Sequence, residues 1–236
     1  MNNRSKNRTI LGVERSTLAY SEGLRTYMLS VYNYMAMGLG LTGGVALLVV
    51  SSPALLHAIM PMMVLFIIAP LALVFFLSFR INTIKYSTAQ MLFWLYAALN
   101  GVAFSTIFLA YTYESVARVF FITAGMFAAM SLYGYTTRKD LTSWGSFLFM
   151  GLIGLIIASV VNIFIASTML QFMVSIAGVI IFTGLTAYDT QSIKDTYVEG
   201  SSAEIAGKRA VFGALRLYLD FINLFFSLLR LMGDRR

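Results

Sequence analysis

Asp220 stands in the middle of the apolar segment LYLDFINLFF at 217–226, in a run of residues long enough to cross a membrane. A second aspartate, Asp189, closes the preceding apolar run. An ionised side chain at bilayer depth is costly unless it is paired, neutralised or hydrated. The two carboxyl groups are therefore candidates for an ion path, a proton relay or a structural lock.

The two aspartates could act as one titrating unit if their helices are neighbours. Two carboxylates that share a site cannot both ionise cheaply, so the pair would bind and release one proton together. Two simpler roles stay open. Asp189 could cap or pair at the membrane interface beside Lys194, and alternatively a local ion pair could form on the last helix. That pair would join Asp220 to Arg216, four residues earlier on the same face.

The composition indicates a membrane protein. Of 236 residues, 59% are hydrophobic and 11% are charged, and the mean hydropathy is +0.80, so polar residues could not cover a soluble globule of this size. The chain has no cysteine, which excludes disulfides, thiolate metal sites and thiol nucleophiles. One histidine, His57, cannot build a metal site by itself. We expect no cofactor and no cleavable signal peptide.

Seven apolar stretches are long enough to span about 30 Å of hydrocarbon as helices. We therefore predict an all-α integral membrane protein with a basic cytoplasmic tail at 1–26 and one membrane domain at 27–236. The predicted spans are 28–50, 58–79, 89–112, 115–135, 144–166, 170–188 and 210–232.

The positions of lysine and arginine predict the orientation, because cytoplasmic loops retain these residues. The tail contributes Arg4, Lys6, Arg8, Arg15 and Arg25, and alternate loops contribute Arg80, Lys85, Arg138, Lys139, Lys194, Lys208 and Arg209. The N-terminus is therefore expected in the cytoplasm. Seven full spans would place the C-terminal arginines outside, and a re-entrant last segment would keep them inside, so both arrangements stay open. The basic residues form no clustered stripe with stacking aromatics, so no nucleic-acid partner is expected.

Two further patterns predict local structure rather than chemistry. The segment GLGLTG at 38–43 matches a dinucleotide-binding pattern but lies inside an apolar span, so we expect helix packing, with Gly40 and Gly44 allowing close approach. Ser201 and Glu204 fit a capping box at the start of the last span.

Three segments resemble the Bax inhibitor-1 (transmembrane Bax inhibitor motif) family in its bacterial inner-membrane branch. They read AYDTQSIK at 187–194, LYLDFINLF at 217–225 and GYTTRKDL at 134–141. The resemblance implies seven helices, with two three-helix layers around a central C-terminal helix. It also implies a passive, pH-sensitive calcium leak in which a hydrogen-bonded aspartate pair, here Asp189 and Asp220, is the proton sensor and a transient calcium ligand.

The resemblance further implies a basic gate partner at the cytoplasmic end of the second helix, which matches Arg80. Some relatives carry an acid within the second span, and this chain has none there. Arg216 is a second possible gate partner, and its charge would hold Asp220 ionised and repel calcium. Contact between the aspartates requires the last helix to begin before residue 210 or the sixth to extend past Tyr188.

Two other functions remain alternatives to the leak channel. An intramembrane aspartyl protease would also present two aspartates on neighbouring helices, but it carries Gly-x-Gly-Asp where this chain has Tyr218-Leu219-Asp220. We therefore predict that the protein is not an enzyme. The third reading is a non-transporting regulator or substrate of a membrane quality-control protease, a stress role that would act through the tail.

Overall fold

The computed structural model describes residues 3–81 and 83–236, with side chains from Tyr20 onward in those ranges. Nearly all of this part of the chain is helical. The helices are α1 (Asn3–Ser51), α2 (Pro53–Ile59), the 3₁₀ turn η1 (Met60–Met62), α3 (Met63–Arg80), α4 (Tyr86–Phe104), α5 (Ile107–Ala110), α6 (Tyr113–Thr136), α7 (Thr142–Ile165), α8 (Thr168–Asp195) and α9 (Ala203–Met232).

Seven helices in the described residues are long and apolar enough to cross a membrane, which confirms the predicted class. They are Tyr20–Ser51, Pro53–Arg80, Tyr86–Ala110, Tyr113–Thr136, Thr142–Ile165, Thr168–Asp195 and Ala203–Met232. Each is longer than predicted, because polar residues continue a helix beyond its apolar core. The extension meets the condition for contact between Asp189 and Asp220. The helix α8 continues past Tyr188 to Asp195, and α9 begins at Ala203, before residue 210.

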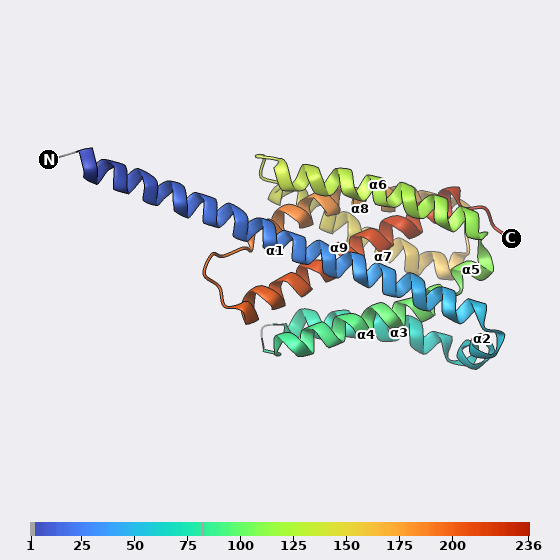
Figure 1. The fold of residues 1–236 in the computed structure, drawn as a ribbon. Coiled ribbons are helices and arrows are strands. Elements are labelled where there is room, and N and C mark those ends of the chain that lie inside the picture. Colours follow the sequence, from blue (N-terminus) through green and yellow to red (C-terminus); the bar gives the residue numbers. More distant parts are fainter. Residues whose placement is uncertain (1–2, 82) are drawn as a thin grey trace.

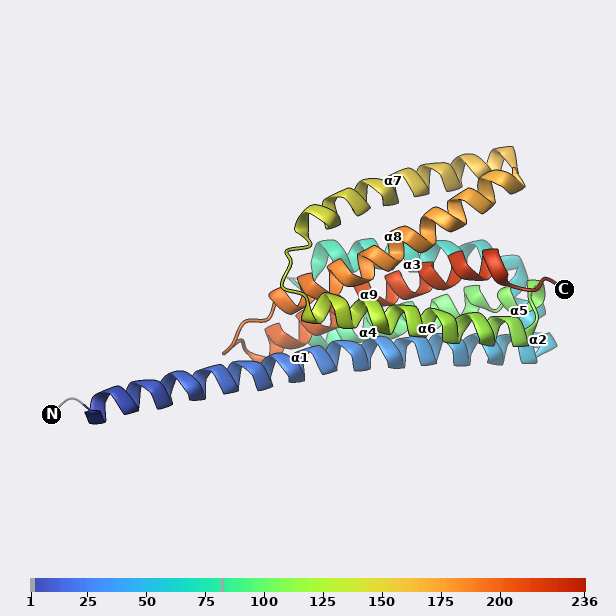
Figure 2. The ribbon, with the colours of Figure 1, turned by 90° about the horizontal axis from the view of Figure 1, so that it is seen from above.

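The last helix, α9, lies at the centre of the bundle (Figures 1 and 2). It packs against α1 and α4 on one side and against α6 and α8 on the other, with α3 behind α4 and α7 behind α8. In the most apolar segment of α9, 67% of the residues are buried inside the bundle, whereas in the corresponding segment of α7 the buried share is 6%. The implied arrangement of two three-helix layers around a C-terminal helix is therefore confirmed, and most side chains of α9 are covered by the other helices.

Close helix packing occurs at glycines other than the predicted pair. A Cβ at Gly40 or Gly44 would meet no described atom within 4 Å, so the expected close approach there is wrong. Instead, a Cβ at Gly38 would lie 2.8 Å from Phe93 of α4, and one at Gly134 would collide with the carbonyl of Ala187. Spacing identifies small residues on one face, but it does not say which face meets a neighbour.

The predicted capping box is also wrong in detail. Ser202, not Ser201, is the N-cap of α9, and its hydroxyl accepts from the backbone amide of Ile205 at 3.4 Å. Glu204 instead accepts from the amide of Tyr86 at 2.7 Å, at the start of α4. A carboxylate favours a helix N-terminus because several amides there lack a backbone partner. Glu204 therefore ties the start of α9 to the start of α4.

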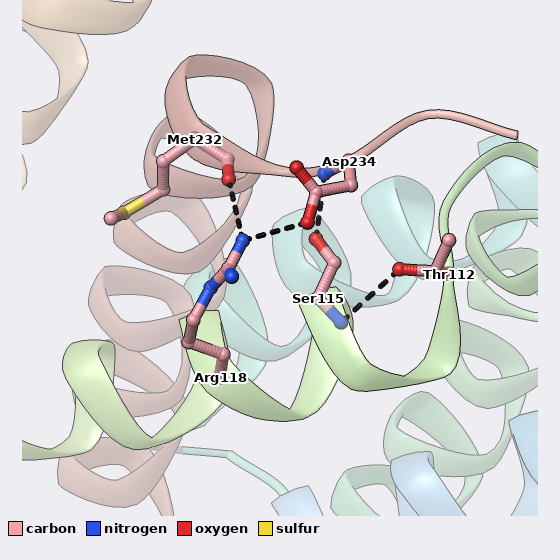
Figure 3. Close-up of polar contacts among 5 residues, drawn as sticks. All are labelled: Thr112, Ser115, Arg118, Met232 and Asp234. Atoms are coloured by element: carbon pink, nitrogen blue, oxygen red, sulfur yellow. Dashed lines mark hydrogen bonds and ion pairs between the residues drawn. The ribbon is translucent and has the colours of Figure 1, made fainter.

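The C-terminal residues fold back onto the start of α6 (Figure 3). Arg118 donates to the Asp234 carboxylate at 2.9 Å and to the Met232 carbonyl at 3.3 Å. The amide of Asp234 donates to the Ser115 hydroxyl at 2.8 Å, and the amide of Thr112 donates to the Asp234 carbonyl at 3.1 Å. The last helix is thus a full span, and the chain ends opposite its N-terminus (Figure 1).

We call the two ends of the bundle its N-terminal end and its C-terminal end. The 81–85, 137–141 and 196–202 loops all lie at the N-terminal end, where α1 projects beyond the bundle (Figure 1). The side chains of Arg4, Lys6, Arg8 and Arg15 lie outside the described residues. The other lysines and arginines that we predict to face the cytoplasm lie at this end. This shared position agrees with the rule that cytoplasmic loops retain basic residues.

A cysteine-accessibility experiment tests the orientation, since the chain has no cysteine of its own. In intact cells, an impermeant thiol reagent should label Arg236→Cys and should not label Arg80→Cys, Arg138→Cys or Lys208→Cys. All four should react once the membrane is permeabilised, which serves as the control. Labelling of any of the three loop positions in intact cells would overturn the predicted topology.

Candidate functional site

The structure brings the two predicted aspartates together at the interface of α8 and α9. Asp189 and Asp220 are 6% and 5% exposed, and a side-chain hydrogen bond joins them. Their approach depends on the extension of α8, because Asp189 lies in its last two turns. The pair therefore forms between two packed helices, where both carboxyl groups are largely shielded from solvent.

Arg216 completes this cluster, but with a different partner from the one predicted. Its guanidinium binds both carboxylate oxygens of Asp189, through Nη2 to Oδ1 and through Nε to Oδ2 at 3.1 Å. Its Nη1 also donates to the Ser192 hydroxyl at 3.2 Å. The expected local pair with Asp220 is thus wrong. The planar guanidinium fork matches a carboxylate that faces it across the interface, which gives bidentate geometry.

The charges of the cluster balance with one retained proton. Asp189 and Arg216 neutralise each other, whereas Oδ2 of Asp220 is buried and has no hydrogen-bond partner among the described residues. A second bare carboxylate here would be desolvated and would face Asp189, so the ionised form of both acids is strongly disfavoured. The geometry fits a neutral Asp220 that donates its proton to the Asp189 carboxylate.

Residues beside the pair hold α8 against its neighbours at the N-terminal end. The Gln191 side chain accepts from the Leu141 amide and donates to the Lys139 carbonyl, both at 2.8 Å. Thr190 donates to the Ser131 hydroxyl of α6 at 3.2 Å. Gln191 and Thr190 both belong to the AYDTQSIK segment at 187–194, which by itself assigns them no role. The sequence feature that indicates such contacts is the run of polar residues directly after Asp189.

The 137–141 loop that Gln191 holds has its own local cap. The backbone amide of Thr142 donates to Asp140 at 2.8 Å, at the start of α7. Hydrogen bonds from the side chain and backbone of Thr142 hold the pKa of the exposed Asp140 below its ordinary value. This loop therefore keeps a charged, hydrogen-bonded acid at the bundle surface, close in sequence to the contacts that fix α8.

The structure does not bring the predicted gate partner Arg80 to the pair. Arg80 ends α3, its side chain is exposed, and within the described residues it forms no ion pair. The second helix packs on α4 rather than on α8 or α9, which explains the separation. Arg216 is thus the cation that contacts the site in this conformation.

The described residues contain no cluster of three or more acidic, histidine or cysteine side chains that could hold a metal ion. Asp189 and Asp220 supply carboxylate oxygens, the ligand type that calcium prefers, but Arg216 occupies both oxygens of Asp189. Calcium ligation by the pair therefore stays a prediction, and it requires Arg216 to move.

These features define a class: a seven-helix membrane protein with a buried carboxyl pair on its central helix. The family model for "Inhibitor of apoptosis-promoting Bax1" matches residues 24–236. The chain therefore belongs to the Bax inhibitor-1 family.

Bacterial relatives cover nearly the full length of both chains. The inner membrane protein YbhL of Escherichia coli is 48% identical over 219 residues, which are 91% of this chain and 94% of YbhL. An uncharacterized protein of Rickettsia prowazekii is 49% identical over 222 residues, with 92% and 93% covered. An uncharacterized membrane protein of Streptococcus pyogenes is 36% identical over 225 residues, with 89% and 93% covered.

The ion pair makes a prediction for stability. Arg216→Ala leaves the buried Asp189 carboxylate without its cation, which should cost about 3 kcal/mol of unfolding free energy at neutral pH. The loss should shrink at acidic pH, where a protonated Asp189 needs no cation. Thermal unfolding of the purified protein in detergent measures both effects.

The exposed Arg230 on the same helix gives a matched control, and Arg230→Ala should change stability little. Adding Asp189→Asn to Arg216→Ala should recover most of the loss. A deficit that is equal at both pH values and is not recovered would mean that Arg216 contributes packing rather than charge.

Proposed function

We propose that the protein is a passive, pH-sensitive calcium leak in which Asp189 and Asp220 act as one proton sensor. The observation that carries this proposal is the buried, hydrogen-bonded carboxyl pair with a single cation. We also propose the bacterial inner membrane as its location, with a cytoplasmic N-terminus. The name of the relative YbhL and the loop charges support this.

The sensor works by charge imbalance. With one proton on the pair, the cluster of two acids and Arg216 is neutral and α8 stays against α9. When that proton is lost, two carboxylates compete for one guanidinium in a medium of low dielectric, and their repulsion favours separation of the two helices. The transition is one coupled event of the pair rather than two independent titrations.

Separation would also create the conditions for calcium to enter. Parted carboxylates offer hard oxygen ligands, which favour a divalent cation over monovalent ions. Arg216 opposes this step because its charge repels calcium, so it must leave Asp189 first. Its existing bond to Ser192 supports such a shift, since one of its nitrogens already has a partner outside the pair.

We propose no catalytic role for the two acids. Tyr218, two residues before Asp220, is completely buried and its hydroxyl lies 2.7 Å from that of Thr42 on α1. An intramembrane aspartyl protease carries glycine two residues before its second aspartate, where this chain has a tyrosine whose side chain is held against α1.

Substitution of either acid tests the sensor. Asp189→Asn and Asp220→Asn should each flatten the dependence of calcium flux on pH, because one remaining carboxyl group has no like charge beside it. The double substitution should add little to either single one. Flux into liposomes that contain this protein alone, measured across pH, is the required experiment.

Asp195→Asn is the matched control, because Asp195 is an exposed acid on the same helix. It should leave the pH response as in the unmodified protein. Additive effects of the two pair substitutions, or a full pH response in both, would show that the acids are not one sensor.

A regulatory role without transport is the second candidate, and the projection of α1 beyond the bundle favours it (Figure 2). A basic helix outside the membrane domain is accessible to a partner such as a membrane quality-control protease. Deletion of residues 2–19 separates the two functions. A leak through the bundle should survive this deletion in liposomes, whereas regulation through the tail should be lost in cells.

A further inference from the structure

Two hollows lie between α1 and α6, one toward each end of the bundle, and we call them together the groove. The half toward the N-terminal end is a hollow of about 520 Å³ between Met28 and Tyr32 of α1 and Phe127 and Leu132 of α6. The other half is a separate hollow of about 400 Å³. The lining residues Arg25 and Leu47 are 22 positions apart on α1, about 33 Å at 1.5 Å per residue. The two hollows are therefore distributed over the thickness of the hydrocarbon core.

The groove is apolar along its walls and carries a cation at its N-terminal end. In the half toward the C-terminal end, Phe221 and Phe225 of α9 join the lining. At the other end Arg25 lines the hollow with its side chain exposed, and it has no hydrogen-bond or ion-pair partner in the part of the chain that the structure describes. An unmatched guanidinium beside an apolar channel is complementary to an anion with an attached hydrocarbon chain.

A second cation lies next to the same end. The Lys194 ammonium donates to the Tyr135 carbonyl at 3.0 Å and lies 5.8 Å from the centroid of the Tyr135 ring. Tyr135 also lines the hollow, so it joins Lys194 of α8 to the groove. The positive charge at this end therefore comes from both layers of the bundle.

We propose that this groove binds one anionic glycerophospholipid from the leaflet at the N-terminal end. An acyl chain lies along the 520 Å³ hollow, and the phosphate pairs with Arg25. A guanidinium binds phosphate through parallel hydrogen bonds, and apolar walls exclude the competing water. Basic sites between membrane helices on the side of anionic lipids recognise headgroups in this way.

The unmatched charge favours a lipid over a helix from a second copy of the chain. An apolar helix seated on the groove would bury Arg25 without a counter-charge, which is costly. A phosphate supplies that charge, and its chain fills the hollow without a backbone that needs hydrogen bonds.

Native mass spectrometry of the full-length protein tests the proposal. The probe is an equimolar mixture of phosphatidylglycerol and phosphatidylcholine with identical acyl chains. The unmodified protein should retain one phosphatidylglycerol in preference to phosphatidylcholine. Arg25→Gln should lower that preference roughly fivefold, and Arg80→Gln, which removes an exposed arginine of α3 outside the groove, should not.

Two neighbouring alanines of α6 provide the matched steric test. Both are exposed, but Ala128 lines the hollow and Ala129 does not. Ala128→Phe should abolish retention of either lipid, and Ala129→Phe should retain lipid normally. No preference for phosphatidylglycerol, or equal losses in Arg25→Gln and Arg80→Gln, would overturn the proposal. A lipid-free dimer that Ala128→Phe dissociates would instead assign the groove to a second copy.

Discussion

Two buried carboxyl groups and one partly buried guanidinium between α8 and α9 impose the constraint on which the rest of the structure depends. Such a cluster is tolerated in a membrane only where protein surrounds it and its charges balance. The central position of α9 meets the first condition, because α1, α4, α6 and α8 enclose it. In the proposed sensor, the second condition is met by one proton on the pair, so protonation and the contact between α8 and α9 change together.

The opposite side of α9 is held by hydrogen bonds between uncharged groups, and its C-terminal end is held by an ion pair. Tyr218 reaches the Thr42 hydroxyl, which also donates to the carbonyls of Gly38 and Ala97. Beyond the end of α9, Asp234 is fixed on Arg118 and Ser115 of α6. The helix is therefore anchored to α1 and tied down at its C-terminal end. In the proposed sensor, a change of charge at the aspartates acts on the contact of α9 with α8.

The sequence was sufficient to predict the seven spans and the all-α class, and to single out Asp189 and Asp220 as buried acids. Each follows from hydropathy or from a charge in an apolar run, which are properties of single segments. The partner of Arg216, the role of Glu204 and the open space at Gly40 were predicted wrongly. Each of these depends on which face of one helix meets another, and no periodicity within a single helix contains that information. The aspartate contact was predictable from the family resemblance. The resemblance matched the cation to Arg80, whereas the spacing from Asp220 singled out Arg216, which is the cation that contacts the pair.

The groove and the aspartate pair both lie where the layer that contains α6 and α8 faces the rest of the bundle. The pair lies where α8 meets α9, and the groove lies where α6, which packs on α8, faces α1, which packs on α9. If loss of a proton moves α8 away from α9 and α6 follows it, the distance between α6 and α1 must change as well. A phospholipid held in that gap would then favour the layer spacing that fits its chain. Lipid composition and pH would act on one equilibrium through different contacts, which is the condition for thermodynamic coupling between two sites.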